Sequence, residues 1–418
     1  MITVRPPEIK VAPEGFAETV ARHTARMKAL WWNSGTAMPD LGRAYTSSQQ
    51  RANERRLNDL RERLTAQWKR LSPGAVDEAN ALRERSLDEV FLFLREVFDF
   101  PAEPLAVLRS SGLIEANQAF AREARRYDPA ISGADIFQAS RNVMTMNFAQ
   151  LLLGLPVELT PSVFAYSMLY PYTDNYLDDP AIPAAEKAAF NRRFYRKLAG
   201  ESLPAANAYE ERIWDLVALV EGQWPRACWP RVYDSLLAIH TAQGRSLKQL
   251  RGDSSPYEVD VLGISFEKGG TSVLADGYLV AGDLDDEQAG FLFSYGAYTQ
   301  LMDDLEDVDG DRKAGFMTIF SQTAGRWPLD GITNTAFHLG ARIFGQMERF
   351  PVPQARPLQA LVLRALNPLL SVSAAGVARH YTRPYLRELE AHMPIRFAAL
   401  SDQRKKLDRA KLPLERFW

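Results

Sequence analysis

Two clusters of aspartates are the residues of this chain best suited to chemistry. Residues 174–179 read DNYLDD, and residues 303–307 read DDLED. Each cluster places carboxylates four positions apart, so that they would share one face of a helix. Like charges placed in this way destabilise an isolated helix by roughly 0.2–0.5 kcal/mol, so a bound partner should offset the repulsion. A divalent cation is the partner that we expect, because Mg²⁺ takes one or two carboxylates and completes its shell with water and substrate phosphate.

Both clusters are predicted to lie at the C-terminal ends of helices. The first follows an apolar run and precedes Pro180, which should end the helix, and the second closes the apolar run 291–302. The negative end of the helix dipole disfavours anions there, so a purely structural helix would carry Lys or Arg instead. Two acidic helix ends that face each other across a cavity would hold a diphosphate through several Mg²⁺ ions, with Mn²⁺ as an alternative ion. The predicted metal ligands are Asp174, Asp178, Asp179, Asp303, Asp304 and Asp307.

Other interpretations of the acidic runs are weaker. An EF-hand loop that starts at Asp307 would need Gly at its sixth position and Glu at its twelfth, where this chain has Arg312 and Thr318. The acidic run 283–287 precedes an apolar helix, so capping and first-turn roles explain it.

The elements that must position these residues are predicted to be helices. Long apolar stretches with helical period alternate with short Pro/Gly breaks, and period-two alternation is scarce, which predicts an all-α protein. Apolar residues make up 46% of the 418 positions, enough for a large core. We expect an N-terminal helical extension over 1–130, including a solvated basic helix around 51–63, and one large domain over 131–418.

Charge and cysteine usage limit the partners. The formal charge of −2 gives no overall field that would recruit nucleic acid or an anionic membrane. Cys228 is the single cysteine, which fits a reducing cytoplasm. The first ten residues lack a secretory h-region, and prolines break the apolar stretch 148–170, so we expect a soluble protein without stable membrane insertion. The helix at 51–63 could make peripheral membrane contact, and residues 1–130 could mediate a homodimer.

An ordered set of motifs between residues 131 and 330 resembles the squalene/phytoene synthases. The set comprises a Ser-Arg pair, an L-P-x-E-L turn, the first aspartate cluster, a YxxxVxG helix and the second cluster, which stand here at Ser140-Arg141, 155–159, 174–179, 257–263 and 300–307. The resemblance implies the class I isoprenoid synthase fold, a helical bundle around a deep apolar cavity. The second cluster also satisfies the DDxxD form of chain-elongating prenyltransferases and of the bacterial terpene synthases akin to them.

The resemblance also implies a mechanism and residue roles. Magnesium ions held by the two clusters would bind the diphosphate of an allylic prenyl substrate and promote its departure, which leaves a carbocation. The catalytic residues would be Asp174, Asp178, Asp303, Asp307 and Tyr257. The residues expected to bind the substrate diphosphate are Ser140, Arg141, Arg312, Lys313, Arg379 and Tyr381. Aromatic faces would attract the cation, and those expected to face the cavity are Tyr166, Tyr170, Phe266, Tyr295 and Tyr298.

Three functions stay open at this point. A terpene synthase would cyclise or rearrange one prenyl diphosphate, and Met302 in place of the family's Arg, together with 266–268 in place of a small-residue pair, favours it. A squalene/phytoene-type prenyltransferase would join two prenyl diphosphates, and the order of the motifs favours that reaction. A non-catalytic helical protein that binds metal ions or a partner is the third.

Overall fold

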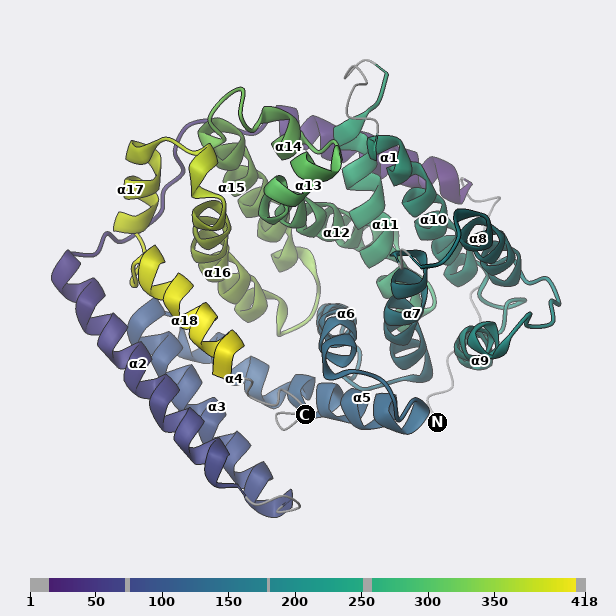
Figure 1. The fold of residues 1–418 in the computed structure, drawn as a ribbon, viewed down its shortest axis with the longest axis horizontal. Coiled ribbons are helices and arrows are strands. Elements are labelled where there is room, and N and C mark those ends of the chain that lie inside the picture. Colours follow the sequence, from purple (N-terminus) through teal and green to yellow (C-terminus); the bar gives the residue numbers. More distant parts are fainter. Residues whose placement is uncertain (1–14, 72–75, 179–180, 251–257, 411–418) are drawn as a thin grey trace. The chain divides into compact units, whose positions relative to one another are not determined.

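The computed structural model describes residues 15–71, 76–178, 181–250 and 258–410. These residues form α-helices and short 3₁₀ helices (η), without a β-strand among them, which confirms the all-α prediction. In chain order the helices are α1 (Phe16–Trp32), α2 (Ser47–Arg70), α3 (Val76–Phe98), α4 (Ala102–Ser110), α5 (Leu113–Tyr127), α6 (Gly133–Leu152), α7 (Pro161–Asp178), α8 (Ala184–Leu198), α9 (Ala208–Gln223), α10 (Pro230–Ser246), η1 (Leu247–Leu250), α11 (Val261–Ala281), α12 (Asp286–Glu306), α13 (Val308–Ala314), α14 (Ile319–Thr323), α15 (Asp330–Phe344), η2 (Gly345–Arg349), α16 (Ala355–Gly376), η3 (Ala378–His380), α17 (Arg383–Ala391) and α18 (Phe397–Ala410) (Figure 1).

The chain divides into two compact units that are interleaved along the sequence. Unit 1 comprises 1–32, 111–301 and 315–317, and unit 2 comprises 33–110, 302–314 and 318–418. The first aspartate cluster belongs to unit 1 and the second to unit 2. The division at residue 130 that we expected from the sequence stays a prediction.

Helix α11 is the central helix of unit 1, and it packs against α1, α6, α7 and α10 (Figure 1). Most of its side chains are buried on all sides, as expected for a helix surrounded by others. Two glycines allow α11 to approach α12 closely. A Cβ at Gly269 would lie 2.3 Å from the carbonyl oxygen of Gly296, so neither position tolerates a side chain without backbone movement.

Helix α1 also belongs to unit 1, although the sequence assigns it to the N-terminal extension. It packs against α10 and α11, and Lys28 Nζ donates to Asp260 Oδ2 at 2.5 Å. The His23 ring stacks on Phe293 with a centroid separation of 5.5 Å. Cys228, on the segment between α9 and α10, is exposed and free.

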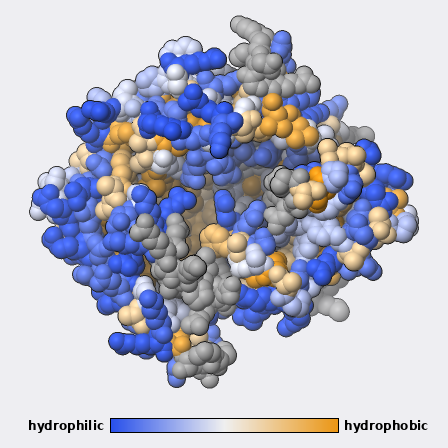
Figure 2. All heavy atoms as spheres, viewed as in Figure 1, coloured by the Kyte–Doolittle hydropathy of each residue, from blue (hydrophilic) through white to orange (hydrophobic). Residues whose placement is uncertain are grey.

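Unit 2 contains the α2–α3 pair and a group of helices around α16. Thr46 and Gln49 form a capping box at the start of α2. Arginines at 51, 55, 56 and 63 are exposed, whereas Leu60 and Trp68 are buried, so α2 is the amphipathic helix that we expected. Hydrophilic residues cover this part of the surface (Figure 2).

Helix α16 packs against α4, α15, α17 and α18 within unit 2. By length and composition it could also cross a membrane, but the core helices of soluble proteins meet the same criterion. Localisation therefore stays a prediction.

Candidate metal and diphosphate site

The first aspartate cluster lies at the end of α7, as its sequence predicts. The helix ends at Asp178 and includes Asp174. The side chains of these two aspartates, and all of Asp179, lie outside the described residues. Tyr257, the predicted start of the YxxxVxG helix, lies outside them too.

Aromatic side chains anchor the last two turns of α7. Tyr172 Oη donates to Asp128 Oδ2 at 2.6 Å, and Arg212 Nη1 donates to the same oxygen at 2.8 Å. Burial, together with the hydrogen bond to Asp128, raises the pKa of the Tyr172 hydroxyl. The Tyr176 ring, between the two aspartates, stacks on Tyr209 at 5.1 Å. The backbone that carries the first cluster is therefore fixed from the side of α9.

The second cluster continues a row of side chains along α12. Positions 295, 299, 303 and 307 are four apart, and the N–H of Asp307 donates to the carbonyl of Asp303 at 2.9 Å, so helical geometry persists through the cluster. Asp303 and Asp307 are both exposed on this row. Asp304, in contrast, is only 3% exposed and faces the interior. Two carboxylates of the cluster are thus accessible together.

An exposed apolar surface lies beside the second cluster within unit 2. Ser373 Oγ of α16 donates to Glu306 Oε1 at 2.7 Å, which joins α16 to the end of α12. Leu369 and Val372, one turn or less from Ser373, are 62% and 40% exposed. Water-exposed carboxylates and water-exposed aliphatic groups are therefore adjacent here, as an amphiphilic ligand would require.

The predicted cations of unit 2 fall into two groups. Arg312 and Lys313 of α13 are exposed, and the Arg312 guanidinium lies against the turn at Gly325, where a Cβ would be 2.5 Å from Nη2. Arg379 Nε instead donates to Asp309 Oδ1 at 3.0 Å. The bond between His380 and Asp309, with Arg379, lowers the pKa of the Asp309 carboxyl. Asp309 therefore holds Arg379 next to α13 and neutralises part of its charge.

Tyr381 lies in the interior of unit 2. It is 8% exposed, its hydroxyl shares a hydrogen bond of 2.7 Å with Thr333 Oγ1, and its ring stacks on Tyr385 at 5.5 Å. Both the ring and the hydroxyl of Tyr381 therefore already have partners inside unit 2. A diphosphate contact at Tyr381 stays a prediction.

Ser140 and Arg141 point to different faces of α6 in unit 1. Ser140 is 2% exposed, and its Oγ donates to the carbonyl of Ile136 at 2.7 Å. Arg141 is exposed, and it lies on the face that carries Phe137 and Met144, which are 45% and 54% exposed. An exposed apolar strip with one arginine at its centre was not recognised from the sequence, although the spacing of 137, 141 and 144 could have revealed it.

The aromatic residues expected to face a cavity are mostly in the core. Phe266 and Tyr298 are buried at 0% and 3% exposure. Tyr295 is half-buried, its ring meets Phe148 edge-on at 5.6 Å, and burial raises its pKa to about 12. The side chain of Tyr170 lies outside the described residues.

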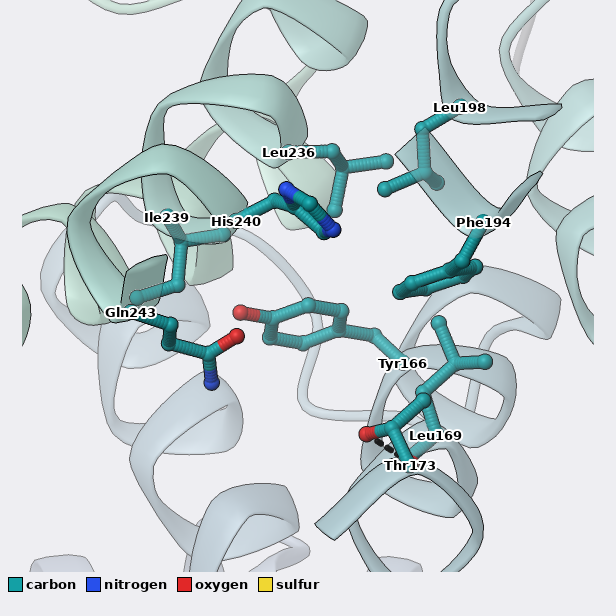
Figure 3. Close-up of a pocket in the computed structure, with 9 residues that line it drawn as sticks. All are labelled: Tyr166, Leu169, Thr173, Phe194, Leu198, Leu236, Ile239, His240 and Gln243. Carbon is teal, nitrogen blue, oxygen red and sulfur yellow. Dashed lines mark hydrogen bonds between the residues drawn. The ribbon is translucent and has the colours of Figure 1, made fainter. Parts of the chain in front are cut away.

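Tyr166 lines a small pocket between α7, α8 and α10 (Figure 3). Its hydroxyl points towards the α10 side chains, among them Gln243. Burial lowers the pKa of His240, which favours the neutral ring. The pocket encloses about 40 Å³, which is space for a few water molecules rather than a prenyl chain.

Asp276 is a buried acid that the sequence reading did not single out. It lies on α11 with no exposed surface, and burial raises its pKa well above the ordinary value, with the polar side chain of Asn142 of α6 beside it. Asn142 in turn donates to Ser167 Oγ of α7 at 3.1 Å. The signal was present in the sequence, because Asp276 is the one charged residue of the run 273–281, which is otherwise almost entirely apolar.

The second cluster supplies only part of a coordination shell for Mg²⁺. Among the described residues, no three His, Cys, Asp or Glu side chains converge as a metal site. Mg²⁺ needs only one or two carboxylates when substrate phosphate and water supply the other ligands. Asp303 and Asp307 meet that requirement, whereas Ser373 restrains Glu306. The convergence of the two clusters on one diphosphate stays a prediction.

Comparisons with known proteins gave no match, whether to models of protein families, to curated proteins or to solved structures.

Proposed function

We propose that the protein is a Mg²⁺-dependent class I terpene synthase, which ionises an allylic prenyl diphosphate and cyclises or rearranges the resulting cation. The observation that carries the proposal is the pairing of exposed Asp303 and Asp307 with the exposed aliphatic surface of α16, joined by the hydrogen bond between Ser373 and Glu306. A prenyl diphosphate has the same two parts, a charged head that binds metal and a hydrocarbon tail. The order of the sequence motifs adds support.

In the proposed reaction the allylic C–O bond breaks and its electron pair leaves with the diphosphate. Mg²⁺, when bound, would stabilise the charge that develops on the leaving group. Asp303 and Asp307 would hold the metal-bound head, and Arg312 and Lys313 would add positive charge. The aliphatic surface around Leu369 would contact the hydrocarbon tail. The cation would end by loss of a proton or by capture of water.

The test is diphosphate release from geranyl, farnesyl or geranylgeranyl diphosphate, each supplied alone with Mg²⁺. We expect Asp303→Asn, Asp307→Asn and Asp174→Asn each to lower the rate at least a hundredfold, because carboxylates are the predicted ligands. Asp59→Asn, an exposed substitution on α2, is the matched control and should retain the rate. Equal release by all four variants would disprove the assignment of the site.

Gas chromatography of the products separates the second candidate from the first. A condensing prenyltransferase is favoured by the order of the motifs, and it would yield a skeleton with twice the carbons of the substrate. Products that retain the substrate's carbon number would support the terpene synthase. Under either proposal the partner is a small prenyl diphosphate and not a nucleic acid, and the enzyme acts in the cytoplasm.

A further inference from the structure

A second site, in unit 1, is independent of the proposed function. Residues of α1 and α10 line most of a groove, and Asp260 and Glu267 complete its lining. Helices α1, α10 and α11 pack together (Figure 1). Its volume is about 520 Å³, which lies within the range of pockets that bind small molecules. All of its lining residues belong to unit 1.

The cations at one end of the groove are already paired. Lys28 of α1 donates to Asp260 at 2.5 Å, and Arg245 of α10 donates to Glu267 at 2.6 Å. These two ion pairs make that end polar but close to neutral, so it offers no net charge to a ligand.

The other end presents a carboxylate that lacks such a partner. Asp234 of α10 lines the groove half-buried, and it makes no hydrogen bond or ion pair within the described part of the chain. Burial raises its pKa, and Arg231 offsets this in part. The Arg231 guanidinium lies over the Phe16 ring, 5.8 Å from its centroid, instead of pairing with Asp234. A cation in the groove would therefore stabilise the ionised form of this carboxyl.

Between the two ends the walls are largely apolar. Val20 and Ala21 of α1 face Leu237 and Ala238 of α10 across the groove. Phe16, whose ring lies under the Arg231 guanidinium, adds apolar surface at the same end of α1.

We propose that this groove binds a small organic cation, with an ammonium group at Asp234 and an apolar body along the walls of α1 and α10. Charge complementarity selects this ligand class, because Asp234 is the one acidic group of the described lining that no basic side chain pairs. An anion would meet Asp234 unfavourably, and a neutral molecule would leave it without a partner.

Calorimetric titration of the full chain tests the charge requirement. The probes are 4-phenylbutylamine and 4-phenylbutan-1-ol, which share an apolar body and differ in the charged group. We expect the amine to bind at least tenfold more tightly than the alcohol, as a charge-assisted hydrogen bond would give. Asp234→Asn should remove that preference, whereas Asp215→Asn, an exposed substitution on α9, should retain it.

A second pair of variants locates the ligand. Ala21→Phe places a ring in the groove and should weaken binding of the amine at least tenfold, whereas Ala29→Phe, at an exposed position of α1 that does not line the groove, should not. Absence of amine binding, equal affinity for amine and alcohol, or an unchanged preference in Asp234→Asn would each overturn the proposal. Unchanged binding in Ala21→Phe would overturn it as well. Diphosphate release is unaffected by any of these outcomes, so the two proposals fail separately.

Discussion

Asp276→Asn should stabilise the protein more at neutral pH than at acid pH. Asp276 has no exposed surface, and burial holds its pKa well above the ordinary value, so the folded protein favours the neutral carboxylic acid. The unfolded chain loses that proton near the usual pKa of about 3.9. Folding above this pH therefore requires uptake of a proton, which Asn at the same position does not need.

The size and the sign of the effect follow from proton linkage. The contribution of Asp276 is fully present below about pH 4 and is lost as the pH rises towards its folded-state pKa. Each pH unit in that window lowers the free energy of unfolding by about 1.4 kcal/mol relative to a side chain that does not titrate. The advantage of Asp276→Asn should therefore grow as the pH rises from 5 to 7, with that slope as its upper limit.

Urea unfolding followed by circular dichroism, at pH 5, 6 and 7, measures this difference. The comparison with the wild type cancels every other titrating group, and a constant offset from the new amide does not affect the slope. Asp59→Asn, at an exposed position of α2, controls for the change in net charge and should give a difference independent of pH. A constant difference between wild type and Asp276→Asn would refute the argument, because it would mean that the buried group is ionised.

Three further predictions concern packing, the second cluster and acid stability. Gly296→Ala should destabilise the protein by about 2 kcal/mol or more, because the new Cβ would lie 2.1 Å from the Gly269 carbonyl oxygen. Gly244→Ala is the control, because the space around this position is open. In the same urea titration it should stabilise α10 by about 0.5–1 kcal/mol. Ser373→Ala removes the hydrogen bond to Glu306 and should change the Mg²⁺ concentration for half-maximal diphosphate release by severalfold. Ser373→Thr should restore the wild-type value. An unchanged Mg²⁺ dependence would contradict the role given to the hydrogen bond. The contacts of His380 and Arg379 lower the pKa of Asp309. The stabilisation from these contacts should be present above about pH 4 and lost as the pH falls. The free energies of unfolding of Asp309→Asn and the wild type should therefore converge in acid, and a difference that does not change with pH would contradict this.

The helical class was predictable because it depends on local information. Apolar spacing and proline breaks act within a few residues, so the ends of α7 and α12 fall where Pro180 and the aspartates indicated. The division into units depends on contacts between distant segments, which leave no local pattern. Thus α1 packs on α10 and α11, although its sequence resembles the rest of the N-terminal region.

The orientation of individual site residues was predictable only in part. Helices α11 and α12 are apolar on most of their faces, so the sequence could not indicate that Phe266 and Tyr298 lie in the core. The spacing of Asp303 and Asp307 predicted that they share one face of a helix, but it did not indicate that both are exposed. Ser140 and Arg141 are adjacent in sequence and therefore about 100° apart around α6. The prediction that both bind the same diphosphate did not take this angle into account.

Cys228 gives this chain a practical advantage, because it is the single thiol of the sequence and it is exposed. A maleimide spin label would react at one place in unit 1 without any mutation. A second thiol introduced by Asp59→Cys in unit 2 would complete a labelled pair. Pulsed electron resonance on that pair would report how the separation of the two units responds when a prenyl diphosphate and Mg²⁺ are added.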